Sequence, residues 1–409
     1  MSERTLPEIA PASRYPRGRT ILIGVIVFVS AGAAAVVYLP GLLLDYWVPN
    51  LTPAERGRLL GNVTQIVLFA LGGIIAVVGV GLSLARHGEA LRAAARDDAR
   101  DAFTQKNEDV RRAELAAFTT AESERTLRER FVVVVDMVRT GDSATTRIAG
   151  LYALAHLADD WIARNVHSEA QVCIDVLCSY LRAPLADGVT TTSPAECEVK
   201  LTGFNLIEAH LSGGPVSWDG FAIDLHGAFI DFDVDLSRIR ISRSGSFTLR
   251  ASTITGSAKV YMQGFTADDH AAIDLREVSV TGNAALNLNG ARFTGSTWLA
   301  MNGLTASADA TISLVDAVFD GNARVDGDTV AATETSKIYL TGITIAGHAR
   351  AHFGSVVVKD QARLWCRNTT VTGHANVTVY GIVVGADAKL HTEGSQIVAP
   401  GTFLLGGGV

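Results

Sequence analysis

The sequence predicts a membrane-anchored protein of mixed class, in which an α-helical N-terminal part precedes an all-β C-terminal part, a parallel β-solenoid. Two observations predict this class. Two apolar segments long enough to cross a bilayer lie between positions 21 and 85, and side-chain size repeats with a 13-residue period from Gly256 onward. The length of 409 residues favours more than one domain. A hydrophobic share of 48% with 19% charged residues excludes a largely disordered chain.

The two apolar segments, 21–44 and 63–85, contain no charged side chain. Each exceeds the roughly 20 residues that cross about 30 Å of hydrocarbon, so we expect two transmembrane helices joined by an external loop at 45–62. Arginines are more numerous on both flanks than in that loop, which predicts a cytoplasmic N-terminal tail (1–20) and a cytoplasmic C-terminal part. A cleaved signal peptide is disfavoured, because the first apolar stretch is long and a second follows.

The next segments are expected to be helical. Residues 86–130 are rich in Ala, Arg and Glu, and we expect a charged stalk, either a self-associating coiled coil or a solvated single helix. Residues 131–184 follow as a helical collar, with breaks near Gly141 and Ser143. Its last helix should start at Ser168, where Gln171 completes a capping box, and end at Pro184. The inner face of that helix is expected to comprise Val172, Val176, Leu177 and Leu181.

A resemblance rests on the motifs of this collar. Its sequence reads LRERFVVVVDMVRTGDSATTRIAGLYALAHLADDW and then VCIDVLCSYLRAP. After two apolar segments and a charged helix, these motifs resemble those of bacterial membrane proteins that contain pentapeptide repeats. The resemblance implies a bacterial plasma membrane and a right-handed solenoid behind the collar. It implies no activity, because the biochemical function of that family is mostly unassigned.

Three consecutive pentapeptides, 199–203, 204–208 and 209–213, match the central-leucine pattern of such repeats. They predict that residues 185–229 form the first coils. The five-residue register is then lost, and here the sequence departs from the family pattern.

A 13-residue repeat organises residues 230–409. Counted from Gly256, position three is always small, and positions five and twelve are always apolar. Inward positions two residues apart indicate short β-strands with one buried face, and Gly, Asn, Ser and Asp mark the corners. Segments 26 apart match best, as 291–293 does with 317–319, which favours two units per coil; a flattened coil of one unit is the alternative.

Outward positions four and six of alternate units carry the candidate binding residues. If each coil contains two units, they lie on one face, in three consecutive rungs, and a cationic strip beside aromatic rings suits an anionic polymer, a sugar chain or an acidic protein surface. The alternative is that exposed strands favour such residues anyway. These residues are Lys337, Tyr339, Arg363, Trp365, Lys389 and His391.

Catalytic motifs are absent from the sequence. There is no GxSxG, HExxH or Walker A motif, and no Asp lies 13 or 26 residues from another Asp to form a dyad. Asp268, Asp269 and His270 indicate a polar turn. His348 and His374, 26 residues apart, could be stacked neighbours; a solvated corner ladder is favoured over a bound metal, because no third ligand is visible. We therefore expect no catalytic residue, no cofactor and no metal.

Charge and cysteines narrow the function further. A net charge of −7 predicts no specific nucleic-acid partner, and the near-balanced charges of residues 230–409 disfavour a DNA mimic. The four cysteines, Cys173, Cys178, Cys197 and Cys366, form no CxxC pair and are too few for a disulfide framework. In a cytoplasmic domain we expect them to be reduced.

The sequence thus predicts a non-enzymatic, membrane-tethered scaffold or interaction protein. Its expected partners are the lipid bilayer and an unknown protein or anionic polymer on the solenoid face. Self-association through the stalk or through the C-terminal end at 403–408 is a further expectation. The alternatives are a solenoid polymer that forms membrane-associated filaments, and a carbohydrate-active or carbohydrate-binding β-helix, which requires the solenoid outside the cell.

Overall fold

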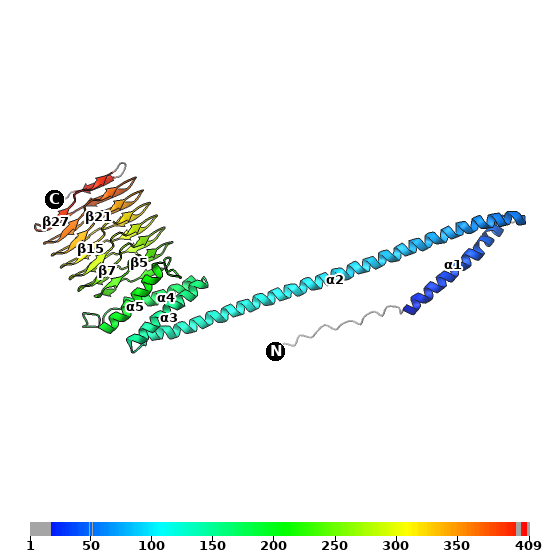
Figure 1. Ribbon diagram of the computed structural model, residues 1–409, viewed down its shortest axis with the longest axis horizontal. Coiled ribbons are helices and arrows are strands. Elements are labelled where there is room, and N and C mark those ends of the chain that lie inside the picture. Colours follow the sequence, from blue (N-terminus) through cyan, green and yellow to red (C-terminus); the bar gives the residue numbers. More distant parts are fainter. Residues whose placement is uncertain (1–17, 49, 51, 398–401, 407–409) are drawn as a thin grey trace. The chain divides into compact units, whose positions relative to one another are not determined.

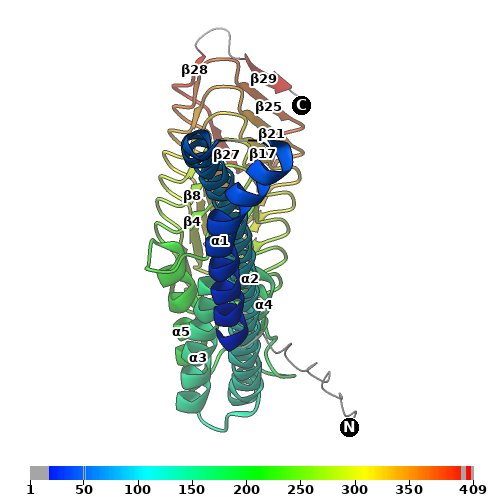
Figure 2. The same cartoon turned by 90° about the vertical axis from the view of Figure 1, so that its right-hand side faces the viewer.

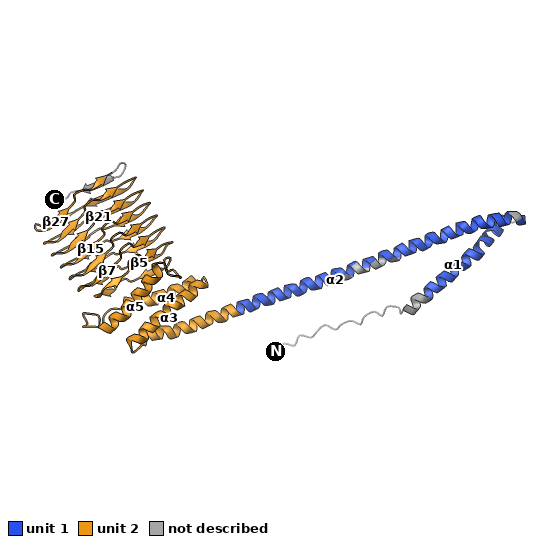
Figure 3. Ribbon diagram, viewed as in Figure 1, with its two compact units in different colours: residues 1–118 blue, residues 119–409 orange. Residues whose placement is uncertain are grey.

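The structure is a computed structural model that describes residues 18–48, 50, 52–397 and 402–406. The chain divides into two compact units, residues 1–118 and 119–409 (Figure 3). Helix α2 belongs to both. Most of the expected N-terminal tail, residues 1–17, lies outside the described residues.

The first unit consists of helix α1 (Gly18–Trp47) and most of helix α2 (Pro53–Thr140). Two segments, Ile23–Trp47 and Glu55–Gly81, have mean hydropathies of 2.2 and 2.4, with 6% of each buried, and both are long and apolar enough to span a membrane. The link between the helices is shorter than the loop expected at 45–62, because α2 already begins at Pro53. Thr52 precedes that residue, and its hydroxyl donates to the Glu55 carboxylate at 2.5 Å.

Helix α2 runs for 88 residues without a break. It contains the second apolar segment, the expected stalk and the first helix of the expected collar. Neither glycine nor proline occurs between Gly88 and Gly141, so nothing in the sequence interrupts the helix before that point. Its last turns bury Leu127, Val134 and Val138 in the core of the second unit.

Helices α3 (Ala144–Ala163), α4 (His167–Leu181) and α5 (Pro194–Leu211) complete the collar. Ser143 caps α3 as expected, since its hydroxyl accepts a hydrogen bond from the backbone N–H of Thr146 at 3.1 Å. The capping box expected at Ser168 is wrong, because α4 begins one residue earlier and no side chain caps it. The Gln171 side chain instead bonds to the backbone of the first strand.

The expected inner face of α4 is half wrong. Leu177 and Leu181 are fully buried, but Val172 is 44% exposed and Val176 only partly buried. The helix contacts α3, α5 and the first strand at once, so the buried face is wider than one stripe and shifted toward other residues. Those residues are Ala170, Cys173, Ile174 and Cys178.

The expectation of pentapeptide coils at 199–213 is wrong, because helix α5 contains this segment as far as Leu211. Ser193 caps the helix by accepting from the backbone N–H of Glu196 at 3.2 Å, and Pro194 occupies the first turn, where it favours helix initiation. Apolar residues at helical spacing then face the collar. The buried ones are Val199, Phe204, Leu206, Ile207 and Leu211.

The residues that carry the family resemblance hold the collar together. The Arg147 guanidinium donates to the Tyr180 hydroxyl at 3.0 Å and to the Glu196 carboxylate at 3.1 Å, which links α3, α4 and α5. Gly150 lets α3 approach α2 closely, since a Cβ there would lie 2.8 Å from a methyl of Val138. The motif residues thus have a packing role.

The rest of the described chain forms a parallel β-solenoid of about seven coils, whose four sheets we call walls A to D (Figure 1). Wall A consists of β1 (Ala222–Asp224), β5 (Ser246–Thr248), β9 (Ala272–Asp274), β13 (Trp298–Ala300), β17 (Arg324–Asp326), β21 (Arg350–Gly354), β25 (Asn376–Tyr380) and β29 (Thr402–Gly406). Wall B consists of β2 (Phe229–Ile230), β6 (Thr253–Ile254), β10 (Ser279–Val280), β14 (Thr305–Ala306), β18 (Ala331–Ala332), β22 (Val357–Val358) and β26 (Val383–Val384).

Walls C and D complete each coil. Wall C consists of β3 (Val234–Asp235), β7 (Lys259–Tyr261), β11 (Ala285–Asn287), β15 (Thr311–Ser313), β19 (Lys337–Tyr339), β23 (Arg363–Trp365) and β27 (Lys389–His391). Wall D consists of β4 (Arg240–Ile241), β8 (Thr266–Ala267), β12 (Arg292–Phe293), β16 (Val318–Phe319), β20 (Thr344–Ile345), β24 (Thr370–Val371) and β28 (Gln396–Ile397). Each coil visits the walls in the order A, B, C, D, so walls A and C lie opposite each other. In Figure 2 the labelled strands of wall D lie on the left and those of wall A on the right.

The strand register confirms the coil of two repeat units, and the single-unit coil is wrong. Leu286, for example, pairs with Val260 below it and with Ile312 above it. The first coil is shorter, since Ile223 pairs with Phe247. The inward positions are buried through most of the coils, as expected from the repeat, but Val384 at position twelve is 42% exposed near the C-terminal end. Four phenylalanines follow one another through the core. Their ring centroids lie 4.8–6.2 Å apart in the order Phe247, Phe265, Phe293 and Phe319.

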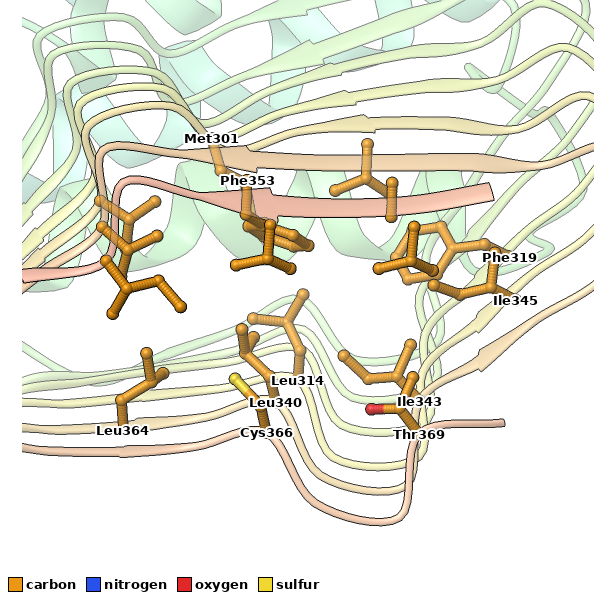
Figure 4. A pocket seen from close by; sticks show the side chains of 17 residues that line it. Met301, Leu314, Phe319, Leu340, Ile343, Ile345, Phe353, Leu364, Cys366 and Thr369 are labelled. Carbon is orange, nitrogen blue, oxygen red and sulfur yellow. The ribbon is translucent and has the colours of Figure 1, made fainter. Parts of the chain in front are cut away.

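The core of the later coils contains a cavity of about 60 Å³ (Figure 4). Apolar side chains from facing walls line it, among them Phe319, Leu340, Ala351 and Leu364. Ala351 is one cause, because its register partners at the same inward position are the larger Val325 and Val377.

The first coil is covered by the collar. The Gln171 amide donates to the Ala222 carbonyl at 2.9 Å and accepts from the Ala222 N–H at 3.0 Å, so it takes the place of a neighbouring strand. At the other end, no further described strand follows β26, β27 or β28. The expected self-association at 403–408 falls partly on residues 407–409, which lie outside the described residues.

Candidate functional site

The six predicted binding residues lie together on wall C, and we call them the wall C strip. Lys337, Arg363 and Lys389 are register partners in consecutive strands, and so are Tyr339, Trp365 and His391. The strip therefore forms two columns, one of cations and one of rings, with rungs about 4.8 Å apart.

The rings of the strip form a continuous stack. The ring centroids of Tyr339 and Trp365 lie 4.4 Å apart at an interplanar angle of 9°. Those of Trp365 and His391 lie 5.4 Å apart at 10°. The three side chains are partly exposed, so the stack presents ring edges and part of its surface to solvent.

The cations of the strip lack carboxylate partners. No ion pair or side-chain hydrogen bond involves Lys337, Arg363 or Lys389 anywhere in the described part of the chain. Like charges in register on neighbouring strands destabilise a sheet. An anionic partner along this column would relieve that repulsion.

An ion pair beside the strip escaped the sequence analysis. The Arg367 guanidinium donates to the Glu393 carboxylate at 2.6 Å and contacts Nδ1 of His391 at 2.9 Å. The sequence feature that could have predicted this ion pair is the 26-residue separation of Arg367 and Glu393, which is the length of one coil. Arg367 thus holds the His391 ring at the end of the stack.

Toward the earlier coils the strip ends in uncharged residues. Lys259 and Tyr261 occupy the same columns, but two strands with Ala285, Asn287, Thr311 and Ser313 separate them from Lys337 and Tyr339. The Ser313 hydroxyl donates to the Asn289 side chain at 2.6 Å.

The other sequence candidates form no reaction centre. The rings of His348 and His374 stack at 5.1 Å as expected, and among the described residues no group of three potential ligands could hold a metal ion. Asp268 pairs with Arg240 at 2.6 Å, as suits a polar turn.

A second surface, on wall A, was missed by the sequence analysis. A hollow of about 340 Å³ lies over strands β17, β21 and β25. Two outward columns line it, Arg324, Arg350 and Asn376 in one and Asp326, His352 and Thr378 in the other. We call these six residues the wall A groove. They occupy positions four and six of the 13-residue units that alternate with the units of the wall C strip. The repeat could therefore have predicted this surface as well.

Asp326 anchors one end of the wall A groove. Although only 6% exposed, its carboxylate accepts from the Arg324 Nε at 2.9 Å and from the Trp298 indole N–H at 2.8 Å. The guanidinium of Arg276 covers the Trp298 ring at 5.5 Å. Burial opposes ionisation of Asp274, but hydrogen bonds from Arg276 outweigh it and lower the pKa of Asp274. This end of the groove is thus a fixed polar network.

Arg350 is the groove arginine whose guanidinium has no partner among the described residues. Its side chain has no hydrogen bond or ion pair in the described part of the chain, and it lies directly above Arg324 in register. His352 beside it contacts the Tyr380 hydroxyl at 3.3 Å and the Asp328 carboxylate at 3.4 Å.

Comparison with known proteins adds no relative. No protein-family model, curated protein or solved structure matches this chain. The class is therefore defined by the fold and its surfaces: a parallel β-solenoid protein that carries two helices apolar enough to span a membrane.

Proposed function

We propose that this chain is a non-enzymatic, membrane-tethered scaffold whose wall C strip binds an anionic partner, either an acidic protein or an anionic polymer. One observation carries the proposal. Three cations stand in register without a carboxylate, beside a stack of three rings. A sheet tolerates such a column at a cost in stability, and an anionic partner offsets that cost.

The anchor is the second part of the proposal. Exposed apolar side chains cover Ile23–Trp47 and Glu55–Gly81, and two spans of a bacterial plasma membrane would bury them in lipid. The arginine distribution favours cytoplasmic termini. The collar motifs favour the architecture of pentapeptide-repeat membrane proteins, with a right-handed solenoid. A reporter fused at Val409 that is active only outside the cytoplasm would contradict this placement.

Binding can be tested on the full chain in detergent. We expect polyglutamate and heparin, as probes, to bind with an affinity that falls as salt rises, because the contact is electrostatic. Arg363→Gln combined with Trp365→Ala should weaken binding at least tenfold. Arg292→Gln on wall D removes an exposed arginine from another wall and is the matched control. Equal losses in both variants, or no binding of either probe, would refute the assignment.

A filament-forming solenoid is the second candidate. The strands β26–β28 have no described neighbour on their outer edge, and Val383 and Val384 are 52% and 42% exposed there. Exposed strand edges favour end-to-end pairing. Electron microscopy of the full chain in detergent tests this: filaments that disappear in Val383→Lys support it, and single particles exclude it.

A further inference from the structure

We propose that the wall A groove binds a small oxyanion that carries hydroxyl groups, a sugar phosphate or a sugar carboxylate. The site lies on the wall opposite the strip, so it is separate from the proposed scaffold function.

The charge of the groove favours an anion. Arg324 and Arg350 are register partners, and the one carboxylate that lines the groove, that of Asp326, pairs with Arg324. That carboxylate already accepts from Arg324 and from Trp298, so the positive charge of Arg350 remains uncompensated. Because a guanidinium fork matches a carboxylate or phosphate bidentately, an oxyanion at Arg350 supplies the missing negative charge.

The free hydrogen-bonding groups favour an acceptor-rich ligand. The Asp326 carboxylate accepts from the Nε of Arg324, so the terminal nitrogens of that guanidinium are not used in this ion pair and can donate to a ligand. On the rung above Arg350, the Asn376 carbonyl oxygen accepts from the Thr378 hydroxyl at 3.2 Å. The Asn376 amino group therefore remains available as a donor beside the anion site. Hydroxyl oxygens next to the charged group of a sugar are suitable acceptors.

The size of the hollow favours a small molecule. About 340 Å³ is at the lower end of the range for ligand pockets, which is of the order of 300–1,000 Å³. The groove spans three rungs, or about 10 Å, and its base is formed by strand backbone in register, which holds the donors at fixed spacing.

The experiment uses the full chain in an uncharged polyoxyethylene detergent, which carries no sugar. Calorimetric titrations compare glucose 6-phosphate, glucuronate, neutral glucose and inorganic phosphate. We expect at least one anionic sugar to bind and glucose to bind at least tenfold more weakly, because charge-assisted hydrogen bonds are the stronger ones. The two anionic sugars distinguish a phosphate from a carboxylate ligand.

Variants locate the site. Arg350→Gln should raise the dissociation constant at least tenfold, Arg350→Lys less, and Asn376→Ala severalfold. Arg363→Gln on the opposite wall is the matched control and should change nothing. Failure of every anionic sugar to bind, equal binding of glucose, or an unchanged Arg350→Gln protein would overturn the proposal. Phosphate binding as tightly as the sugars would overturn the sugar assignment. Polyanion binding at the wall C strip would persist in each case.

Discussion

A column of glycines along one corner of the solenoid allows a sharp test of the coil geometry. Gly321 has φ +70°, and an added Cβ would lie 3.0 Å from the nitrogen and 3.1 Å from the oxygen of Gly295, one coil below. Gly256 at an equivalent corner has φ +69° and open space where its Cβ would be. The two sites therefore share the backbone strain and differ in the contact between coils.

The expected cost can be worked from these geometries. Placing alanine at positive φ costs about 1–2 kcal/mol, and the stiffer unfolded chain offsets roughly half of that, so Gly256→Ala should lose about 1 kcal/mol. In Gly321→Ala the coil below must also move. Its Gly295 carbonyl accepts from the Asn322 N–H at 2.7 Å, and weakening that bond adds about 1 kcal/mol.

Hydrogen exchange measured by mass spectrometry is the appropriate assay, because each coil contacts only its neighbours and opens locally. Each substitution should speed exchange in the peptides around it relative to the unsubstituted protein. The increase around residue 321 in Gly321→Ala should exceed the increase around residue 256 in Gly256→Ala by roughly fivefold per added kcal/mol. Equal losses at the two sites would refute the close approach of the coils.

The same structure supports four further predictions. Ala351→Val should stabilise the later coils by about 1 kcal/mol in denaturant unfolding, because it fills part of a cavity whose cost is of the order of 24 cal/mol per Å³. Arg363→Gln should raise the melting temperature at low salt by relieving repulsion worth about 0.5–1 kcal/mol, and the gain should vanish in high salt. Burial opposes protonation of His210, but hydrogen bonds to Asp159 and to a backbone carbonyl outweigh it and raise the pKa of His210. Protonated His210 therefore adds to the free energy of unfolding fully below the unfolded pKa of about 6.5, and this gain is lost as pH rises through the folded pKa. The pH dependence of the melting temperature that comes from His210 should disappear in Asp159→Asn. Burial raises the pKa of Cys366 to about 12, so iodoacetamide at pH 8.5 should label it in the denatured chain but not in the native one, as mass spectrometry would detect.

Much of the solenoid could be predicted because a repeat reports the same physical environment many times. Small residues at position three and apolar residues at positions five and twelve are required wherever a narrow core is built from identical rungs. The same period brought Lys337, Arg363 and Lys389 into one column, since in-register stacking converts a spacing of two repeat units into adjacency.

The collar was less predictable because its patterns are ambiguous in one dimension. Leucines five apart at 201, 206 and 211 suit a pentapeptide coil, yet Leu206 and Leu211 also lie on one buried face of α5. The N-cap at Ser193 and the proline at 194 favour a helix start at this point. This local signal was outweighed in the sequence analysis by the five-residue spacing of the leucines. Gln171 likewise fits a capping box by sequence, but in the structure its side chain bonds to the backbone of Ala222 at the edge of the first strand.

The apolar helices and the 13-residue period can be read from the sequence, because composition and period depend only on local order along the chain. The strand register was needed to choose two repeat units per coil over one, and the fold was needed to show which outward charges have a partner. Arg324 has Asp326, Arg367 has Glu393, and Arg350 and Arg363 have neither, since the partner of a charge is set by which coil lies beside it in space.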